Sequence, residues 1–270
     1  MFKKPIYLFI GSVLLITTSC SDYNKLVKST NLDKKYEMAV KYYEKEDYVK
    51  ALTLLEELIT LYRGTSKEEN ALYYYANTNY YMGDFEMARY HFRNFVKSFP
   101  NNKYAEECAF MTAECYYLNS PSYSLDQSDT KIAIKEFQAF INEYPKSTRV
   151  AQGNEIIDKL REKLEKKYYE ISKQYYHTGD YKSAVYSFNN TLKDFPDTKF
   201  REELNFLIIK SYYLLALNSI ESKKAERLKL TIDAYIKFVD NFPNSVFLKS
   251  AESLYESAIK MKEQFKTKTS

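Results

Sequence analysis

The chain repeats one arrangement of apolar positions, and each repetition closes on an aromatic residue followed by proline. A small residue stands twelve positions before the proline, a large one eight positions before it, and a further one, mostly aromatic, five positions before it. These offsets fall on one face of an α-helix, so the pattern predicts an amphipathic helix in each repetition. Proline cannot continue a helix and disfavours helical geometry in the residue before it. The aromatic–proline steps are Phe99-Pro100, Tyr144-Pro145, Phe195-Pro196 and Phe242-Pro243.

A second kind of turn precedes each of these helices, so every copy is expected to be a pair of helices. Glycine allows a helix to end in the left-handed conformation, and aspartate can cap the helix that follows. The inner turns are Glu46-Asp47, Gly83-Asp84 and Gly179-Asp180. The helical stripes are Ala88, Phe92 and Phe95; Ala133, Phe137 and Phe140; Ala184, Phe188 and Thr191; Thr231, Tyr235 and Phe238; and, in an N-terminal copy with Arg63 in place of proline, Ala51, Leu55 and Leu58.

At these positions the chain resembles the tetratricopeptide repeat family, although it lacks that family's first-helix Trp. The resemblance implies an all-α protein, a right-handed α-solenoid of about five degenerate repeats with a C-terminal capping helix. We expect repeats at about 32–65, 66–102, 103–147, 148–198 and 199–245, and the cap at 246–266. Three segments exceed the usual repeat, and we expect an inserted loop at 119–129, a longer first helix over 149–167 and a longer inner turn at 218–226.

The first 20 residues have the pattern of a secretory signal, with basic residues, a short apolar run and small residues before Cys20. The apolar run from Ile6 to Ile16 is too short for a transmembrane helix, which needs about 20 residues. The end of the segment resembles a bacterial lipobox, although Thr17 stands where Leu is usual. We therefore expect residues 1–19 to be removed, Cys20 to be lipidated and residues 20–31 to act as a tether. An ordinary signal peptide with a chance cysteine and an uncleaved anchor are the alternatives.

Composition narrows the function classes. Five glycines in 270 residues disfavour glycine-rich phosphate loops and turn-rich β folds. Without the two lysines of the signal, 40 − 2 = 38 basic residues face 36 acidic ones, so no basic stripe for nucleic acid is expected. His91 and His177 have no second ligand at metal-binding spacing, and we expect neither a metal nor another cofactor.

Two further groups of residues could carry chemistry, and both have simpler explanations. Cys108 and Cys115 are seven residues apart in a helical pattern, about 10.5 Å along the axis, which is too far for a disulfide. The acidic pairs could serve a glycosidase, but a solvated helix face or a favourable first-turn charge explains them better. These pairs are Glu56-Glu57, Glu68-Glu69, Glu106-Glu107 and Glu202-Glu203. We therefore predict that the protein is not an enzyme.

Tyrosine is unusually abundant, with 28 residues, and most of them are expected to pack in or near the core. A minority could line the concave face of the repeats and anchor a bound peptide, since tyrosine is favoured at binding hot spots. By the register of the tetratricopeptide family, the candidate peptide-binding residues are Tyr36, Tyr43, Tyr73, Asn77, Tyr81 and Tyr176.

A closer resemblance is to the BamD family, lipoproteins of the outer-membrane β-barrel assembly (BAM) machinery. It rests on the polar loop Asp126-Gln127-Ser128, the repeat end Tyr144-Pro145-Lys146-Ser147 and the next end at Asp194-Phe195-Pro196, and it covers nearly the whole mature chain. Tyr62-Arg63 departs from the Tyr-Pro that is usual at the first repeat end.

This resemblance implies a non-enzymatic scaffold anchored at the outer membrane and facing the periplasm. The N-terminal repeats would bind unfolded outer-membrane proteins, and the C-terminal repeats would dock on periplasmic domains of a BamA-type barrel, beside other BAM lipoproteins. Three alternatives stay open: an adaptor for cell-wall enzymes, a solenoid muramidase, and a surface-displayed binding lipoprotein. A muramidase would need a catalytic domain for which the repeats leave no length. The segment Ser21-Asp22-Tyr23-Asn24 is not the strongly acidic tag of a surface lipoprotein, which favours the periplasmic face.

Overall fold

A computed structural model describes residues 22–269, which form α-helices and connecting turns without a β-strand. The all-α class expected from the sequence is therefore confirmed for the described part of the chain. The signal segment and Cys20 lie outside the described residues. None of the helices searched in the described part is long and apolar enough to span a bilayer.

The chain divides into two compact units. The N-terminal unit comprises the described residues up to 121 together with 126–160, and the C-terminal unit comprises 122–125 and the residues from 161 onward. Helix α8 begins in the first unit and ends in the second. The helices are α2 (Leu32–Glu44), α3 (Tyr48–Leu61), α4 (Glu68–Tyr81), α5 (Phe85–Ser98), α6 (Ala105–Asn119), α7 (Ser128–Glu143), α8 (Val150–His177), α9 (Tyr181–Asp194), α10 (Arg201–Leu217), α11 (Glu221–Asn241) and α12 (Leu248–Thr269).

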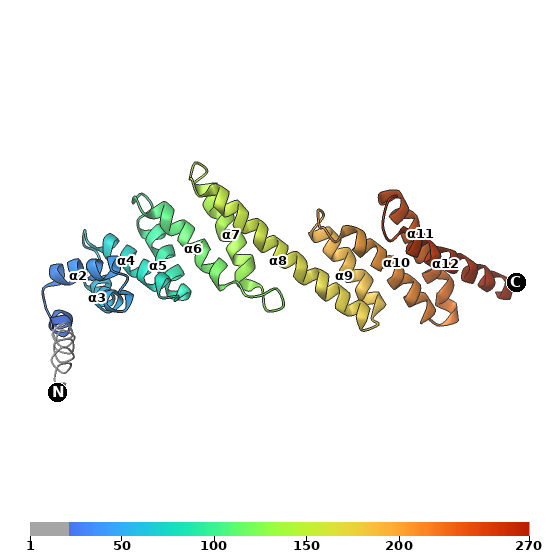
Figure 1. The fold of residues 1–270 in the computed structure, drawn as a ribbon, viewed down its shortest axis with the longest axis horizontal. Coiled ribbons are helices and arrows are strands. Elements are labelled where there is room, and N and C mark those ends of the chain that lie inside the picture. Colours follow the sequence, from blue (N-terminus) through green and yellow to red (C-terminus); the bar gives the residue numbers. More distant parts are fainter. Residues whose placement is uncertain (1–21, 270) are drawn as a thin grey trace, which may run out of the picture. The chain divides into compact units, whose positions relative to one another are not determined.

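Within each unit, successive helices pack side by side as pairs joined by short turns (Figure 1). In the N-terminal unit α2 packs on α3, α4 on α5, and α6 on both α5 and α7. In the C-terminal unit α10 packs on α9, α11 and α12. Paired helices with small residues at their crossings are the architecture of the tetratricopeptide repeat, so the predicted fold class is confirmed.

The predicted stripe is the core of the helix pairs. Ala88 and Phe92 on α5 have no exposed surface, and neither do their counterparts on α7 and α9. The small alanine lets the neighbouring helix approach, and the aromatic ring fills the space beside it. The corresponding residues are Ala133 and Phe137 on α7, Ala184 and Phe188 on α9, and Ala51 and Leu55 on α3.

The inner turns have the predicted chemistry. Gly83 and Gly179 adopt left-handed backbone angles, with φ of 80° and 82°. The aspartate that follows each of them caps the next helix, since Asp84 accepts a hydrogen bond from the Met87 amide at 3.0 Å. Glu46 occupies the same position in the first pair with φ of 60°, a conformation that costs a residue with a side chain about 1–2 kcal/mol.

The turns between pairs are fastened to the preceding first helix, a feature that the sequence analysis missed. The side chain of Thr198 donates to Glu165 Oε1 of α8 at 2.5 Å and accepts from the Phe200 amide at 3.1 Å. Four residues after that glutamate, Tyr169 stacks on Phe200 with ring centroids 3.9 Å apart. We call this combination of hydrogen bond and ring contact the turn clasp.

The turn clasp recurs at every aromatic–proline step. Its polar part joins Asn102 to Glu69, Ser147 to Glu106, Thr198 to Glu165 and Ser245 to Glu202. Its ring part joins Tyr73 to Tyr104, Phe110 to Arg149, Tyr169 to Phe200 and Phe206 to Phe247. Three glutamates of the acidic pairs, Glu69, Glu106 and Glu202, lie in the first turns of their helices, as one of the two simpler explanations expected, and they also hold the turns in place.

Two of the three expected longer segments have the predicted form. The loop between α6 and α7 covers residues 120–127, and α8 extends over 28 residues. The longer inner turn at 218–226 was a wrong prediction, because α11 already begins at Glu221. Most residues from Glu221 to Glu226 favour a helix, and the acidic Glu221 stabilises the first turn of α11. The additional residues of this repeat therefore lengthen α11 and not the turn before it.

The inner turns give a matched pair of predictions. We expect Glu46→Gly to raise the free energy of unfolding by about 1 kcal/mol, because glycine relieves the left-handed strain. We expect Gly83→Ala to lower it by about the same amount, since no atom lies within 4 Å of the added Cβ and only the backbone is strained. Urea unfolding followed by circular dichroism measures both changes. Shifts of the same sign in the two variants would contradict this explanation.

Candidate functional site

Four of the candidate tyrosines form one network of ring contacts in the N-terminal unit, which we call the tyrosine surface: Tyr36 and Tyr43 on α2, and Tyr73 and Tyr81 on α4. Tyr74 joins them, because its ring contacts Tyr36, Tyr43 and Tyr73 at centroid distances of 6.3, 5.2 and 5.5 Å. Tyr43 also contacts Tyr81 at 6.0 Å. All four contacts are edge-to-face, an arrangement that aromatic quadrupoles favour.

Besides Tyr74, two further tyrosines that the sequence analysis did not select extend this surface. Tyr48, at the start of α3, stacks on Tyr81 with centroids 5.1 Å apart and ring planes 9° apart. Tyr104, just before α6, stacks on Tyr73 at 3.9 Å as part of a turn clasp. Both lie directly beside turns, and the turn pattern was the signal that could have identified them.

The members of the tyrosine surface differ in what they offer a ligand. Tyr81 has 53% of its surface exposed, while Tyr36 and Tyr43 are half-buried. One face of the Tyr73 ring is used by the clasp, and its hydroxyl donates to Glu107 Oε2 at 3.1 Å. The accessible part of the surface is therefore centred on Tyr43 and Tyr81, near the inner turns of the first two pairs.

The hydroxyl groups of Tyr36, Tyr43 and Tyr73 stay protonated at physiological pH. Burial, reinforced by neighbouring tyrosines, raises the pKa of Tyr36 to about 12. Burial and the nearby Tyr81 and Tyr48 raise the pKa of Tyr43, and burial together with Glu107 raises that of Tyr73. The surface thus presents neutral rings and hydrogen-bond donors.

Two of the predicted residues do not belong to this surface. Asn77 is only 2% exposed, and its amide donates to the Tyr73 carbonyl of its own helix at 2.9 Å, so it cannot reach a peptide. The prediction for Asn77 is corrected for that reason. Tyr176 lies in the C-terminal unit, where its ring contacts Tyr181 at 5.9 Å and the Lys210 ammonium at 5.4 Å.

The cysteines have the buried packing role that their spacing indicated, and His91 packs against a tyrosine ring. Cys108 and Cys115 are free thiols without exposed surface, and burial raises the pKa of Cys115 to about 12. His91 contacts the Tyr75 ring at 4.7 Å, and burial lowers its pKa. Across residues 22–269, no three His, Cys, Asp or Glu side chains come together as a metal site would require.

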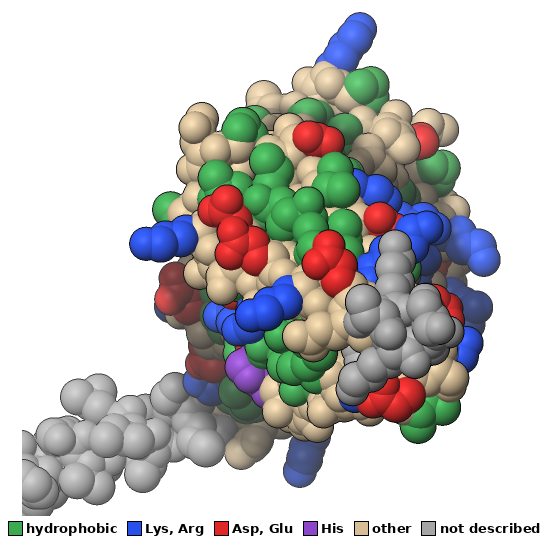
Figure 2. Space-filling model, turned by 90° about the vertical axis from the view of Figure 1, so that its right-hand side faces the viewer, with side chains coloured by type: hydrophobic (Ala, Val, Ile, Leu, Met, Phe, Trp, Pro, Cys, Tyr) green, Lys and Arg blue, Asp and Glu red, His purple; other side chains and the backbone are tan. Residues whose placement is uncertain are grey.

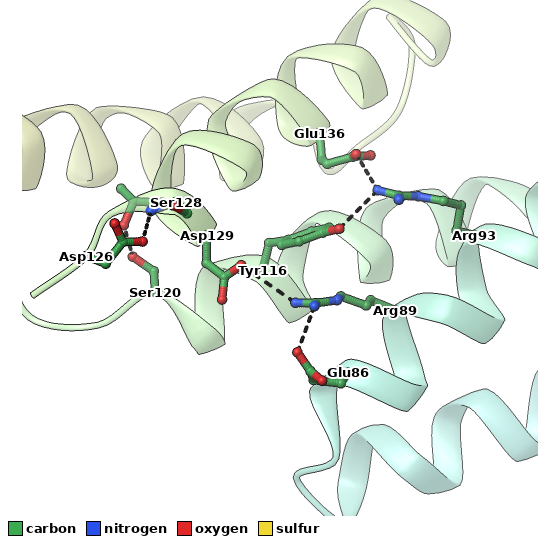
Figure 3. A network of polar contacts seen from close by, with 10 residues as sticks. Glu86, Arg89, Arg93, Tyr116, Ser120, Asp126, Ser128, Asp129 and Glu136 are labelled. Carbon is green, nitrogen blue, oxygen red and sulfur yellow. Dashed lines mark hydrogen bonds and ion pairs between the residues drawn. The ribbon is translucent and has the colours of Figure 1, made fainter.

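A groove of about 380 Å³ lies between α5 and α7, with Val96, Ala139 and Phe140 among its lining residues. Arg93 pairs with Glu136 across this groove, with 2.5 Å between Nη2 and Oε1 (Figure 3). Arg93 and Arg89 both contact the Tyr116 ring, at 5.6 and 4.4 Å from its centroid. These charges are paired among themselves, so the network braces α5, α6 and α7.

One face of the molecule carries charges of both signs. The face turned to the viewer in Figure 2 carries acidic, basic and hydrophobic side chains side by side, and no single sign of charge dominates it. A nucleic-acid partner would need a continuous basic stripe, and this face has none.

The sequence matches one family model and one relative over most of its length. A family model named YfiO, described as an outer membrane lipoprotein, matches residues 29–228. The chain is also 24% identical over 282 residues to "Putative outer membrane protein assembly factor BamD" of Aquifex aeolicus (strain VF5). That alignment covers 97% of this chain and 90% of the relative.

Solved structures that resemble the chain are tetratricopeptide proteins. The TPR2AB domain of yeast Sti1 has a TM-score of 0.41 at 16% identity and covers 84% of this chain and 98% of its own. A thermophilic TPR protein of Thermus thermophilus has a TM-score of 0.34 at 17% identity, with the same coverage of both chains. Scores this low carry no argument, and the fold rests on the helix pairs themselves. Because the family model matches well over half of the residues, the chain belongs to the YfiO family of outer membrane lipoproteins.

Proposed function

We propose that this protein is a non-enzymatic scaffold of the BAM complex, lipid-anchored through Cys20 to the periplasmic side of the outer membrane. Its N-terminal unit binds unfolded outer-membrane proteins, and its C-terminal unit docks on the periplasmic domains of a BamA-type barrel, beside other BAM lipoproteins. The observation that carries the proposal is the family match, together with an alignment to a protein named as an outer-membrane assembly factor over 97% of this chain.

The tyrosine surface supports the substrate part of the proposal. Strands of outer-membrane barrels carry aromatic residues at the membrane interfaces and alternate apolar with polar side chains. A surface of neutral rings and hydroxyls suits such a strand, because aromatic pairs contribute about 0.5–1.5 kcal/mol each beyond their buried area. Tyr43 and Tyr81 are the residues we assign to this contact, with Tyr36 beside them.

The assembly part of the proposal is tested by purifying the tagged chain from detergent-solubilised cell envelope. We expect a BamA-type barrel protein and further lipoproteins to co-purify in comparable amounts. Recovery of cell-wall enzymes without the barrel would overturn the proposal and favour the adaptor function instead.

The substrate part is tested with a fluorescent peptide copying the C-terminal strand of an outer-membrane protein. We expect the Tyr43→Ala, Tyr81→Ala double variant to bind it about tenfold more weakly, the loss of roughly 1.4 kcal/mol of ring contacts. The matched control is Tyr186→Ala, since Tyr186 is a tyrosine of the C-terminal unit with 70% of its surface exposed. Anisotropy titrations with equal affinities for all three proteins would refute this assignment.

The same titration has an expected pH dependence. Burial raises the pKa of Tyr36 to about 12 and also raises the pKa of Tyr43, so both hydroxyls stay neutral beyond the ordinary tyrosine pKa of about 10. The part of the affinity that depends on these two residues should therefore stay level from pH 6 to about 10.

A further inference from the structure

The first described residues are not a free tether. Residues 22–27 form a short helix that packs on α2 and α3. Leu26 is 8% exposed and belongs to the core that contains Ala39 and Ala51. Tyr23 contacts the Tyr42 ring edge-on at 5.7 Å and donates its hydroxyl to the Lys50 carbonyl at 3.3 Å.

This docking fixes where a lipid on Cys20 would leave the protein. Asp22 follows Cys20 by two residues, which is at most about 7 Å of extended chain. Tyr23, the next residue, is already held against the start of α3. A lipid on Cys20 must therefore emerge close to that end of the first helix pair.

Exposed apolar and aromatic side chains lie near that point. Val49, beside Lys50 at the start of α3, has 66% of its surface exposed. Tyr81 and Met82 at the end of α4 are 53% and 43% exposed, and the stacking of Tyr48 on Tyr81 joins the two groups. Tyrosine is enriched where proteins meet the membrane interface, since its ring is apolar and its hydroxyl stays hydrated.

We propose that this edge, consisting of Tyr23, Val49 and Met82, rests on the lipid surface that holds the anchor and so fixes the orientation of the N-terminal unit, with Tyr81 beside it left to the substrate. The inference depends on the proposed lipidation of Cys20. The tether keeps the edge within reach of the bilayer, so even a weak apolar contact is populated. Because Tyr81 is adjacent to Met82, the tyrosine surface would then lie directly beside the membrane.

Apolar contact, not charge, accounts for the attraction. The first inner turn carries three acidic residues, Glu44, Glu46 and Asp47, and one basic residue, Lys45, so it has no excess of positive charge for anionic lipid. Asp47 is further neutralised by its ion pair with Lys50, whose Nζ lies 2.5 Å from Oδ2. The contact should therefore form on zwitterionic lipid and resist added salt.

The test uses the absence of tryptophan from the natural sequence. The mature chain, starting at Cys20, is coupled through that thiol to a maleimide lipid in phosphatidylcholine vesicles containing brominated chains. Cys108 and Cys115 have no exposed surface and should remain unmodified. A single Val49→Trp substitution then reports the lipid contact by quenching of its fluorescence.

We expect the fluorescence of Val49→Trp to fall at least twofold on brominated relative to ordinary lipid, equally at low salt and at 0.5 M salt. The control is Leu61→Trp at the other end of α3, about 18 Å along the axis and 49% exposed, which should not be quenched. Equal quenching at both positions, quenching at neither, or loss of the Val49→Trp signal in salt would overturn the proposal.

A second variant tests the docked segment itself. Adding Leu26→Ala and Tyr23→Ala to the Val49→Trp chain should remove most of the quenching while the coupled chain stays on the vesicles and keeps its helical circular dichroism. Unchanged quenching would contradict the role of residues 22–27. Lipidation is tested separately, because a Cys20→Ala chain that stays in the membrane fraction of cells would refute the anchor, whereas the vesicle experiment supplies its own lipid.

Discussion

The stacking of the helix pairs depends on one repeated contact, the clasp between each turn and the first helix of the preceding pair. In each clasp, a side-chain hydroxyl or amide of the turn donates a hydrogen bond to a glutamate of the preceding first helix. A ring contact joins that same helix to the residue just before the next helix. A hydrogen bond to a charged group contributes about 1.5–3 kcal/mol, and a stacked pair about 1 kcal/mol more. Repeated at each step within a unit, these terms orient every new first helix relative to the one before it.

This contact also places the tyrosine surface. Tyr73 and Tyr104 are clasp residues, and their stacking sets the position of α4 against the start of α6. Tyr43 and Tyr81 occupy the neighbouring space between α2 and α4, at the end of the unit where the docked residues 22–27 lie. Substrate contact and membrane contact would therefore meet at the same edge of the N-terminal unit, as a protein that receives unfolded chains beside a bilayer requires.

The sequence predicted those features that follow from local chemistry and periodicity. Ala88 and Phe92 share one face of a helix, so their spacing predicted that both are buried. Gly83 can adopt the left-handed conformation and Asp84 can cap the next helix, so this pair predicted the inner turn. The clasp glutamates could not be predicted in this way, because their partners stand 33 to 43 residues further along the chain. The same limit explains the wrong prediction for Asn77. Helical register gives the direction of a side chain, but it does not show which residues bury it.

The most direct test of this account is a double-mutant cycle on the clasp between Thr198 and Glu165. Thr198 is 6% exposed, so valine can replace it with little change in shape, and Glu165→Ala removes the acceptor. Urea unfolding followed by circular dichroism should give a coupling energy of about 1 kcal/mol between the two substitutions. A coupling energy near zero would show that the turns are held by the helix core alone, and would contradict the account.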